Sequence, residues 1–375
     1  MKLLIISAGG YPSNNDLYKS MFVHKRVKEY VNLKNDCCVF VPKGLTNENA
    51  DYSFEGIYVK IGELKELIKI KSEFKPNVVL IHFLNKTVIK FLIFHDGVIP
   101  IIFWVHGYGA ISIFRYLFEF KLTKIFLLEF YVNIKNLIMF NFLNRKQIKK
   151  NIHYVFVSNW MKKVAATDTL SLFKSFRIIP NPIDENLFNY KLKDAEQRKK
   201  ILLIRSFHNK KYANDIAIKG IIELSKSKIF PELEFAIYGY GIHFELLTSK
   251  IRPLMNVKIY NKFLTHYEIS NLHKEFGIFL CPTRIDAQGV SMCEAMQSGL
   301  VPITSNSTAI PEFVTNNVDG FLTNNSSEIA DKIIYLFANP DKFLQMSNFA
   351  SQNILQKSGS NKVIKSELDF INSLI

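Results

Sequence analysis

Short apolar runs alternate with longer segments of helical periodicity along the whole chain. In the first half the runs lie at residues 2–7, 37–41, 78–83, 100–106 and 154–159. In the second half they lie at residues 200–206, 233–239, 257–261, 278–283 and 301–305. Apolar runs of strand length that alternate with helical segments are typical of parallel strands joined by crossover helices. The pattern therefore predicts an α/β protein with two consecutive, doubly wound, Rossmann-like domains.

A segment rich in turn residues separates the two series of strands. Residues 177–188, RIIPNPIDENLF, contain two prolines and few apolar repeats, which indicates a hinge. The chain has 375 residues, of which 48% are hydrophobic, and this is more than one ordinary core accommodates. We expect the first domain to span residues 1–182 and the second to span residues 183–360.

Composition indicates a compartment and a class of partner. The four cysteines, two adjacent and two distant from each other, show neither metal-ligand spacing nor a disulfide framework. The first apolar run is too short for a signal peptide, so we expect a cytoplasmic protein. The formal net charge of +15 favours nucleic acid, anionic lipid or a phosphate-rich ligand. No nucleic-acid-binding motif is present, so nucleic acid is not expected as a partner.

Part of the positive charge lies in a segment that is also rich in apolar residues. Residues 111–150 interleave many Phe, Leu and Ile with Lys and Arg and contain few acids. The segment is too charged to span a bilayer. It could form helices that lie on an anionic membrane surface, which would make the protein peripheral on the inner face of the cytoplasmic membrane. An ordinary pair of core-facing helices is the alternative, and the sequence leaves both open.

Two carboxylates flank a glycine turn in the second half. Asp286 and Glu294 lie on either side of Gly289 in RIDAQGVSMCEAMQSG, directly after an apolar run. Doubly wound sheets bind ligands at the carboxyl ends of their strands, and the segment after the turn predicts a short helix closed by Gly299. Four amides are expected to form a phosphate cradle at the start of this helix. They belong to Gln288, Gly289, Val290 and Ser291.

The two acids are expected to bind different parts of one ligand. Glu294 lies one turn into the predicted helix, where it could accept hydrogen bonds from the vicinal hydroxyls of a ribose. Asp286 lies ahead of the turn and is expected to face the sugar side of a bound diphosphate. Simple helix capping is the alternative for the whole element.

This stretch resembles the acid-x7-acid element of family 4 glycosyltransferases, which are retaining enzymes of the GT-B fold. The matching residues are Glu294, Ala295, Met296, Gly299 and Pro302. The first acid is Asp286, where the family usually has glutamate. The resemblance implies an acceptor domain and a donor domain that face each other across a cleft. It also implies that the C-terminal helix, residues 361–375, packs back on the first domain.

A basic loop after the first strand of the second domain supports the resemblance. RSFHNKK is similar to the family's arrangement of Arg, four residues and Lys, which selects Arg205 and Lys210. Lys211 is a competing candidate, and the glycine that follows the family's lysine is missing. The resemblance implies that these cations neutralise the departing nucleoside diphosphate. An ordinary exposed basic loop is the alternative.

Two further loops of the second domain are similar to nucleotide-binding loops of the family. Gly239 and Gly241 in YGYG resemble its Gly-x-Gly turn, where the backbone approaches the nucleotide. The base is expected to lie against the loop around Phe263 and Leu264.

Two loops of the first domain complete the candidate site. Gly9 and Gly10 in SAGGYP resemble the family's glycine loop near the donor phosphates and the acceptor. His106 in WVHG resembles the histidine that contacts the transferred sugar and is included among the catalytic candidates. Turn chemistry and an ordinary strand-end histidine are the respective alternatives.

The resemblance implies a hexosyltransferase-type enzyme. It would move a sugar with retention from a nucleotide-diphosphate sugar to a glycan or lipid-linked acceptor in bacterial surface polysaccharide synthesis, such as that of O-antigen, lipopolysaccharide or capsule. No cofactor and no divalent metal are expected, because no metal-ligand cluster is apparent. A GT-B sugar-nucleotide epimerase and a non-catalytic nucleotide-sugar-binding subunit are the alternatives.

Overall fold

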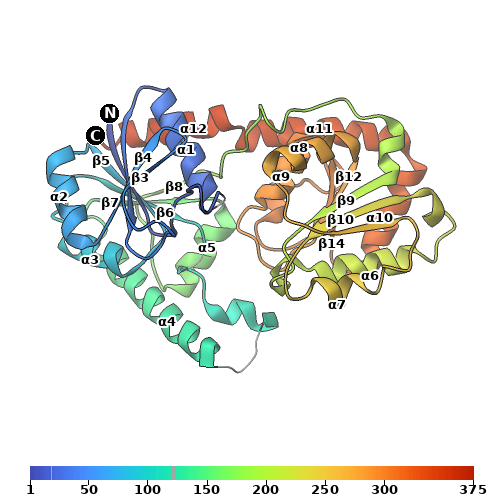
Figure 1. The fold of residues 1–375 in the computed structure, drawn as a ribbon, viewed down its shortest axis with the longest axis horizontal. Helices are drawn as coiled ribbons and strands as arrows, with labels where there is room; N and C mark the ends of the chain where they lie inside the picture. Colours follow the sequence, from blue (N-terminus) through green and yellow to red (C-terminus); the bar gives the residue numbers. More distant parts are fainter. Residues whose placement is uncertain (18, 108, 120–123) are drawn as a thin grey trace. The chain divides into compact units, whose positions relative to one another are not determined.

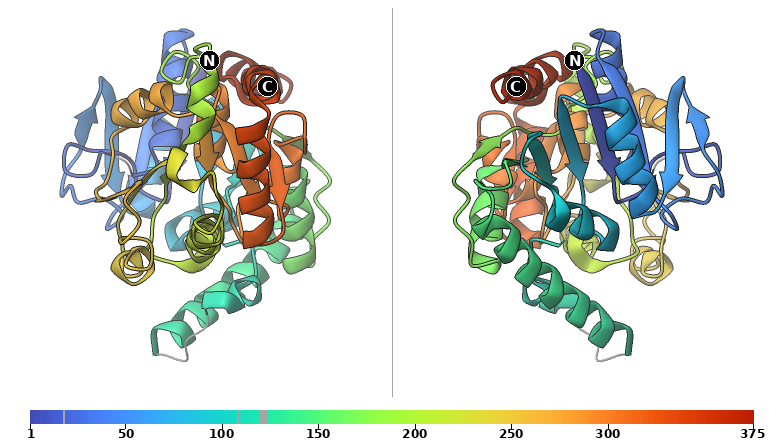
Figure 2. Two further views of the ribbon diagram at one scale, coloured as in Figure 1. Left: turned by 90° about the vertical axis from the view of Figure 1, so that its right-hand side faces the viewer. Right: turned by 90° about the vertical axis from the view of Figure 1, so that its left-hand side faces the viewer.

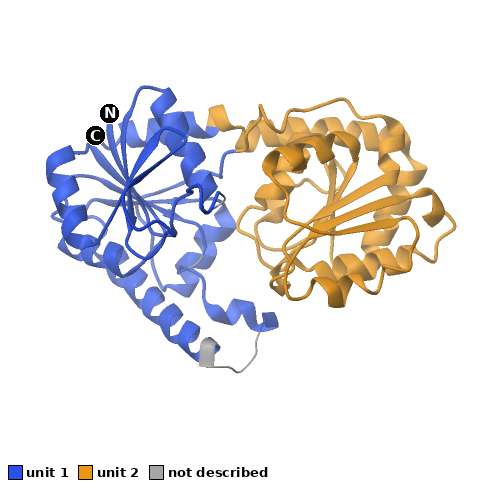
Figure 3. Ribbon diagram, viewed as in Figure 1, with its two compact units in different colours: residues 1–182, 363–375 blue, residues 183–362 orange. Residues whose placement is uncertain are grey.

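The computed structural model describes residues 1–17, 19–107, 109–119 and 124–375. It divides into two compact units (Figure 3). Unit 1 comprises Met1–Pro182 and Val363–Ile375, and unit 2 comprises Ile183–Lys362. Each unit is a mainly or wholly parallel sheet surrounded by helices (Figure 1). The predicted pair of Rossmann-like α/β domains is confirmed.

Unit 1 is built on an eight-stranded sheet in the order β3-β4-β2-β1-β5-β6-β7-β8. Its strands are β1 Lys2–Ser7, β2 Asp36–Pro42, β3 Tyr52–Phe54, β4 Ile57–Gly62, β5 Val78–His82, β6 Ile101–Val105, β7 Ile152–Phe156 and β8 Phe176–Ile178. The pair β3–β4 is antiparallel, and the other neighbouring strands are parallel. The central strands β5 and β6 are buried along their whole length, because helices cover both faces of a parallel sheet.

The helices of unit 1 include one from the far end of the chain. They are α1 Met21–Asn32, α2 Leu64–Phe74, α3 Lys86–Phe94, the 3-10 segment η1 Ile113–Glu119, α4 Lys124–Arg145, α5 Asn159–Asp168 and α12 Ser360–Asn372. Helix α12 begins in unit 2, and its later residues belong to unit 1. There Val363, Ile364, Phe370 and Ile371 join the buried core.

A buried ion pair fixes α12 to unit 1. Arg26 Nε donates to Glu367 Oε1 at 2.8 Å, and both side chains are fully buried. Tyr30 donates its hydroxyl to the other oxygen of Glu367, and Arg26 Nη2 donates to Asn181 Oδ1 at 3.1 Å. Removing one partner of such a pair typically costs about 3–5 kcal/mol, because the other charge stays buried and unpaired.

Helix α4 is mostly exposed, and its buried residues lie in its second half. Residues Phe126–Arg145 are long and apolar enough to cross a membrane by length and composition. Leu137, Phe140 and Leu143 are nevertheless buried within unit 1, whereas the start of the helix extends away from the sheet (Figure 2). These residues of α4 thus contribute to the core of unit 1, and the membrane-surface interpretation of residues 111–150 stays a prediction. Residues 120–123 of that segment lie outside the described residues.

Unit 2 is built on a parallel six-stranded sheet in the order β11-β10-β9-β12-β13-β14. Its strands are β9 Lys200–Ile204, β10 Glu234–Gly239, β11 Val257–Asn261, β12 Ile278–Leu280, β13 Val301–Ser305 and β14 Phe321–Thr323. Its helices are α6 Asn214–Leu224, α7 Phe244–Thr248, α8 His266–Glu275, α9 Val290–Gln297, α10 Ser326–Ala338 and α11 Pro340–Ser358. Its 3-10 segments are η2 Ala195–Lys199, η3 Lys210–Tyr212, η4 Phe230–Glu232 and η5 Ile310–Glu312.

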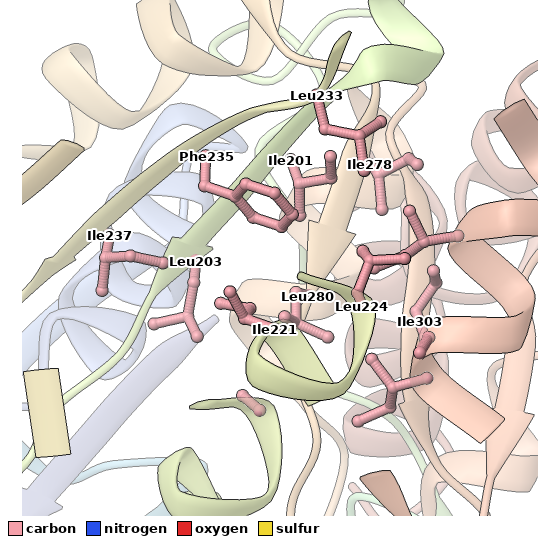
Figure 4. Packing of buried hydrophobic residues seen from close by; sticks show 14 of the residues in the cluster. Ile201, Leu203, Ile221, Leu224, Leu233, Phe235, Ile237, Ile278, Leu280 and Ile303 are labelled. Atoms are coloured by element: carbon pink, nitrogen blue, oxygen red, sulfur yellow. The ribbon is translucent and has the colours of Figure 1, made fainter. Parts of the chain in front are cut away.

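The core of unit 2 holds its parallel strands in register, so that their carboxyl ends lie along one edge of the sheet. Ile201, Leu203 and Leu280 from adjacent strands are fully buried and pack with Ile221 and Leu224 of α6 (Figure 4). Because the strands are parallel, the loops that follow them emerge at one edge of the sheet, the carboxyl edge. The loops after β9 and β12 are neighbours there, although they are far apart in the sequence.

Candidate active site

Arg205 connects the loop after β9 to the start of α9. Its Nη1 donates to Ser291 Oγ at 2.9 Å, and its Nη2 donates to the Cys281 carbonyl at 3.3 Å. The residue is only 7% exposed, and its buried Nε has no hydrogen-bond partner among the described residues. The buried guanidinium of Arg205 is thus held beside the N-terminus of α9 with its Nε–H unpaired. The charge of Arg205 and the dipole of α9 together favour an anion there.

The two candidate lysines have different surroundings. Lys211 Nζ lies 4.6 Å from the centroid of the Tyr212 ring. The guanidinium carbon of Arg205 lies 5.1 Å from the same centroid. The Lys210 residue is exposed, and its carbonyl accepts a hydrogen bond from Arg284 Nη1 at 2.7 Å. The structure therefore places Lys211 beside the ring of Tyr212, which Arg205 also contacts.

A salt bridge that was not singled out from the sequence joins the two loops. Arg284, after β12, donates to both carboxylate oxygens of Asp215 at 2.8 and 2.7 Å. Its backbone N–H donates to the Lys211 carbonyl at 2.7 Å. Burial alone would raise the pKa of Asp215, but the hydrogen bonds and charge of Arg284 outweigh burial, and the net shift is downward. The bridge fixes the backbone from which Lys211 projects.

Asp286 binds the backbone of its own loop. Its Oδ1 accepts hydrogen bonds from the amides of Gln288, at 3.1 Å, and Gly289, at 2.7 Å. The expected four-amide phosphate cradle is corrected by this contact, because two of its amides already have a carboxylate partner. The amides of Val290 and Ser291 remain as candidates at the start of α9. For Asp286 itself, Oδ2 is the atom left for a sugar.

Glu294 lies inside the first turns of α9. Its side chain is 9% exposed, and its Oε1 lies 3.9 Å from Nε2 of His266, which is 30% exposed. The helix ends as expected, because Gly299 has a φ of 84° and donates to the Met296 carbonyl at 2.9 Å. The carboxylate is thus largely desolvated but keeps a small exposed area beside a partly exposed histidine.

Packing explains the two glycines that follow β10. A Cβ atom on Gly239 would collide with the Arg205 carbonyl, and one on Gly241 would collide with the His208 amide. Gly241 also has a φ of 135°, which a side chain rarely permits. Both glycines therefore allow this turn to pack directly on the Arg205 loop. Their contact with a nucleotide stays a prediction.

Exposed aromatic rings lie at the ends of β9, β10 and β11. Tyr240 meets Phe263 at 5.6 Å between ring centroids, and His208 meets Tyr240 at 5.0 Å, both edge to face. Phe263 is 49% exposed, so a flat base could stack on it. The side chain of Leu264 is buried, and the contact of this loop with a base stays a prediction.

His106 of unit 1 is surrounded by aromatic rings. Its Nε2 lies 3.0 Å from Nδ1 of His82, and its ring centroid lies 4.7 Å from Phe22 and 5.1 Å from Phe83. Burial lowers the pKa of both histidines well below the usual range, and the charge of Arg26 adds to the shift. The two imidazoles are therefore neutral near pH 7, and Nδ1 of His106 is the nitrogen left for a ligand.

The predicted glycine loop of unit 1 lies beside the same rings. A Cβ atom on Gly9 would overlap the ring of Phe83, and Gly10 has a φ of 89°. Phe83 thus touches both Gly9 and His106, which brings these two candidates together. In the part of the chain that the structure describes, no group of three or more His, Cys, Asp or Glu residues could hold a metal ion.

Comparison with known proteins identifies the domain in unit 2. Residues 185–353 match the model of the family described as glycosyl transferases group 1. The chain is 26% identical over 172 residues to the UDP-N-acetylglucosamine–peptide N-acetylglucosaminyltransferase GtfA subunit of Streptococcus agalactiae, which is 43% of this chain and 33% of that protein. It is 27% identical over 148 residues to the poly(ribitol-phosphate) alpha-N-acetylglucosaminyltransferase of Staphylococcus aureus strain COL, with 38% and 29% covered.

A solved structure resembles the whole chain. The crystal structure of Anabaena HepE in complex with UDP and glucose aligns over 100% of both chains, with a TM-score of 0.68 and 16% identity. Most of unit 2 thus matches the glycosyl transferases group 1 model, and the chain has the GT-B fold. The chain spans about a third of the length of the two curated relatives. These matches support the predicted enzyme class, a glycosyltransferase.

Proposed function

We propose that the protein is a retaining glycosyltransferase that transfers a hexose-type sugar from a nucleotide-diphosphate sugar to a glycan or lipid-linked acceptor. One observation carries this proposal. Arg205, buried and hydrogen-bonded to Ser291 at the start of α9, keeps a free N–H beside Lys211 and Tyr212. Such an arrangement suits a departing diphosphate, whose charge grows as the glycosidic bond breaks.

Three groups would share the charge of the leaving group. Arg205 offers N–H donors in a fixed planar geometry, and Lys211 offers a mobile point charge. The amides of Val290 and Ser291 would add the helix N-terminus. The geometry is held in place, because the Arg284–Asp215 bridge and the Arg205–Ser291 bond join the loops after β9 and β12.

The rest of the donor would lie along the carboxyl edge of unit 2. Glu294 would accept hydrogen bonds from the ribose, and the base would stack near Phe263 and Tyr240. The names of both curated relatives specify N-acetylglucosamine transfer, and one of them specifies a UDP-linked donor. We propose UDP-N-acetylglucosamine as the first donor to test.

The neutral site around His106 and Gly9 would hold the sugar and the acceptor hydroxyl. In the proposed reaction, the bond between the anomeric carbon and the phosphate oxygen breaks and the acceptor oxygen bonds to that carbon. The acceptor proton passes to the departing diphosphate. Front-face retention and a cytoplasmic role in surface polysaccharide synthesis rest on the family resemblance. Metal independence rests on the cations and helix amides that would take the place of a metal. The S. aureus relative, whose name specifies a polymeric acceptor, supports a polymer or its precursor as substrate.

A donor screen tests the proposal. Purified protein is incubated with a panel of nucleotide sugars, with and without extracts of glycan and lipid-linked acceptors and with and without EDTA, and released nucleoside diphosphate is measured. We expect acceptor-dependent release, largest with UDP-N-acetylglucosamine and unaffected by EDTA. Glu294→Gln should weaken donor binding about 10- to 100-fold, the loss of a hydrogen bond to a charged group. NMR of the product's anomeric proton reads retention directly.

Two results would replace the proposal with an alternative. Conversion of the donor to an epimer without acceptor would favour the epimerase. Tight donor binding without turnover under every condition would favour the binding subunit. If release of nucleoside diphosphate requires a divalent metal, the expected metal independence is wrong. The proposal that the protein is a transferase would still hold.

A further inference from the structure

Three loops at the amino edge of the unit 1 sheet hold apolar side chains out in solvent. Strands β6, β7 and β8 are parallel neighbours, so the segments that precede them lie side by side. Phe94, the last residue of α3, and Val98, in the loop before β6, are 73% and 78% exposed. Ile148, before β7, is 73% exposed, and Leu170 and Leu172, before β8, are 84% and 74% exposed. We call these five residues the loop edge.

Hydrogen bonds tie the three loops into one surface. Lys150 Nζ donates to the carbonyls of Ile93 at 2.6 Å and His95 at 2.7 Å, which joins the first loop to the second. The buried Gln147 donates through Nε2 to the Leu172 carbonyl at 3.0 Å, which joins the second loop to the third. The backbone is thus fixed while the side chains stay exposed. Because the backbone of these loops is fixed, their apolar side chains stay exposed to solvent.

The surroundings of the loop edge are basic. Residues 124–177 contain ten Lys and Arg and only two acids, Glu129 and Asp168. Asp168 is paired with Arg115 at 2.7 Å, and Asp96, beside Val98, lies 3.5 Å from Lys71. The exposed cations next to the apolar residues are Arg145, Lys146, Lys149 and Lys174.

We propose that the loop edge docks unit 1 on an anionic phospholipid bilayer. Side chains that are about three-quarters exposed protrude from the surface, so they can enter the acyl region, and the surrounding cations can bind head groups. A second copy of the chain is a poor occupant, because two equally basic surfaces would repel each other. The surface differs from the predicted segment 111–150, with which it shares Ile148 and the cations around it.

The location of this surface constrains the acceptor. The loop edge lies at the amino ends of the strands, whereas Gly9 and His106 follow the carboxyl ends of β1 and β6. A five-residue strand such as β6 spans about 17 Å at about 3.3 Å per residue. A membrane-anchored acceptor would therefore need a spacer of at least that length between its lipid and its reactive hydroxyl.

Vesicle sedimentation of the full-length chain tests the proposal. The lipids are phosphatidylcholine alone and phosphatidylcholine with added phosphatidylglycerol, each at low and high salt. We expect binding to the anionic vesicles that weakens with salt. Leu170→Ser with Leu172→Ser should lower the partition coefficient at least about tenfold through lost apolar insertion. Lys149→Glu with Lys174→Glu should remove the preference for anionic lipid.

Matched controls lie on unit 2. Leu192 is 84% exposed, as Leu170 is, and Leu192→Ser should leave binding unchanged. Lys228→Glu should change it far less than the paired lysine variant does. A thermal melt shows whether each variant folds, and Ile148→Ser replaces the double leucine variant if that variant does not.

Three outcomes would overturn the proposal. They are equal binding to neutral and anionic vesicles, no loss of binding in folded loop-edge variants, and a self-association that the same variants abolish. The last result would assign the loop edge to contacts between copies of the chain. None of these measurements depends on the enzymatic activity.

Discussion

The carboxyl edges of the two sheets differ in charge. In unit 2 this edge presents Arg205 and Asp286, which are anchored by hydrogen bonds, and Lys211, which lies against an aromatic ring. It also presents Glu294, whose Oε1 lies 3.9 Å from Nε2 of His266. In unit 1 the corresponding edge presents two neutral histidines between aromatic rings. A charged edge suits a nucleoside diphosphate, and a neutral edge suits the hydroxyls of a sugar. In the proposed reaction, the charged edge of unit 2 would hold the diphosphate, and the neutral edge of unit 1 would hold hydroxyls of the sugar.

Removing the buried cation should have the largest effect. Arg205→Ala is expected to lower kcat about 10²- to 10³-fold, because a pre-organised group that stabilises the leaving group contributes about 2.7–4 kcal/mol. Ser291→Ala leaves the charge in place and removes one anchor, so it should lower kcat only a few-fold. Steady-state release of nucleoside diphosphate measures both variants. A rise in KM with unchanged kcat would mean that Arg205 binds the donor without stabilising its departure.

The neighbouring lysines provide an internal comparison of intermediate size. Lys211→Met is expected to lower kcat about tenfold, and Lys210→Met less than about threefold, because Lys211 lies against the ring that carries Arg205. Both variants lose the same charge and keep a similar length, so each serves as the control for the other. If Lys210→Met has the larger effect, Lys210 is the functional cation. The family's spacing from Arg205 then identifies this lysine, and the contact of Lys211 with the Tyr212 ring does not.

The third comparison concerns acid stability and has the smallest effect on activity near neutral pH. All five histidines of unit 1 have lowered pKa values, chiefly through burial. In unit 2, burial lowers the pKa of His273 to about 3. Unfolded histidines take up protons near pH 6.5 and buried neutral ones do not, so stability falls as the pH drops below that value. Unit 1 should therefore unfold at higher pH than unit 2.

Tryptophan fluorescence separates the two units, because both tryptophans, Trp104 and Trp160, lie in unit 1. For His82 and His106 together, the expected loss is up to roughly 3 kcal/mol at about pH 5.5, or about 1.4 kcal/mol for each histidine and pH unit. Urea unfolding followed by fluorescence and by circular dichroism at two pH values measures it. His82→Gln should reduce the pH dependence. Coincident transitions for the two signals would contradict the difference between the units.

The sheets could be predicted because most of their strands are continuous apolar runs. The hairpin of β3 and β4 was not predicted, since its strands are partly exposed and mix polar with apolar residues. The only feature of the sequence that indicates this hairpin is Gly56 in the turn, where both Glu55 and Gly56 have positive φ. Strands β8 and β14 have three residues each, which is too short for a periodic pattern to be recognised.

The sequence singled out the candidate site residues, but it indicated few of the contacts between them. The Asp286 contact is local, and an aspartate three residues before a helix-opening glycine could have indicated it. Arg205 and Ser291 are 86 residues apart, and they meet because β12 lies beside β9 in the sheet. The order of strands is set by packing of the whole domain, so single-sequence patterns did not show this pair.

The bond between Arg26 and Glu367 joins residues that are 341 positions apart. Synthesis produces the whole of unit 2 before residue 367 is made. Until then, α1 has no carboxylate to neutralise its guanidinium, and the hydrophobic space that α12 fills stays open. Unit 1, the first to leave the ribosome, is thus the second to reach its complete structure.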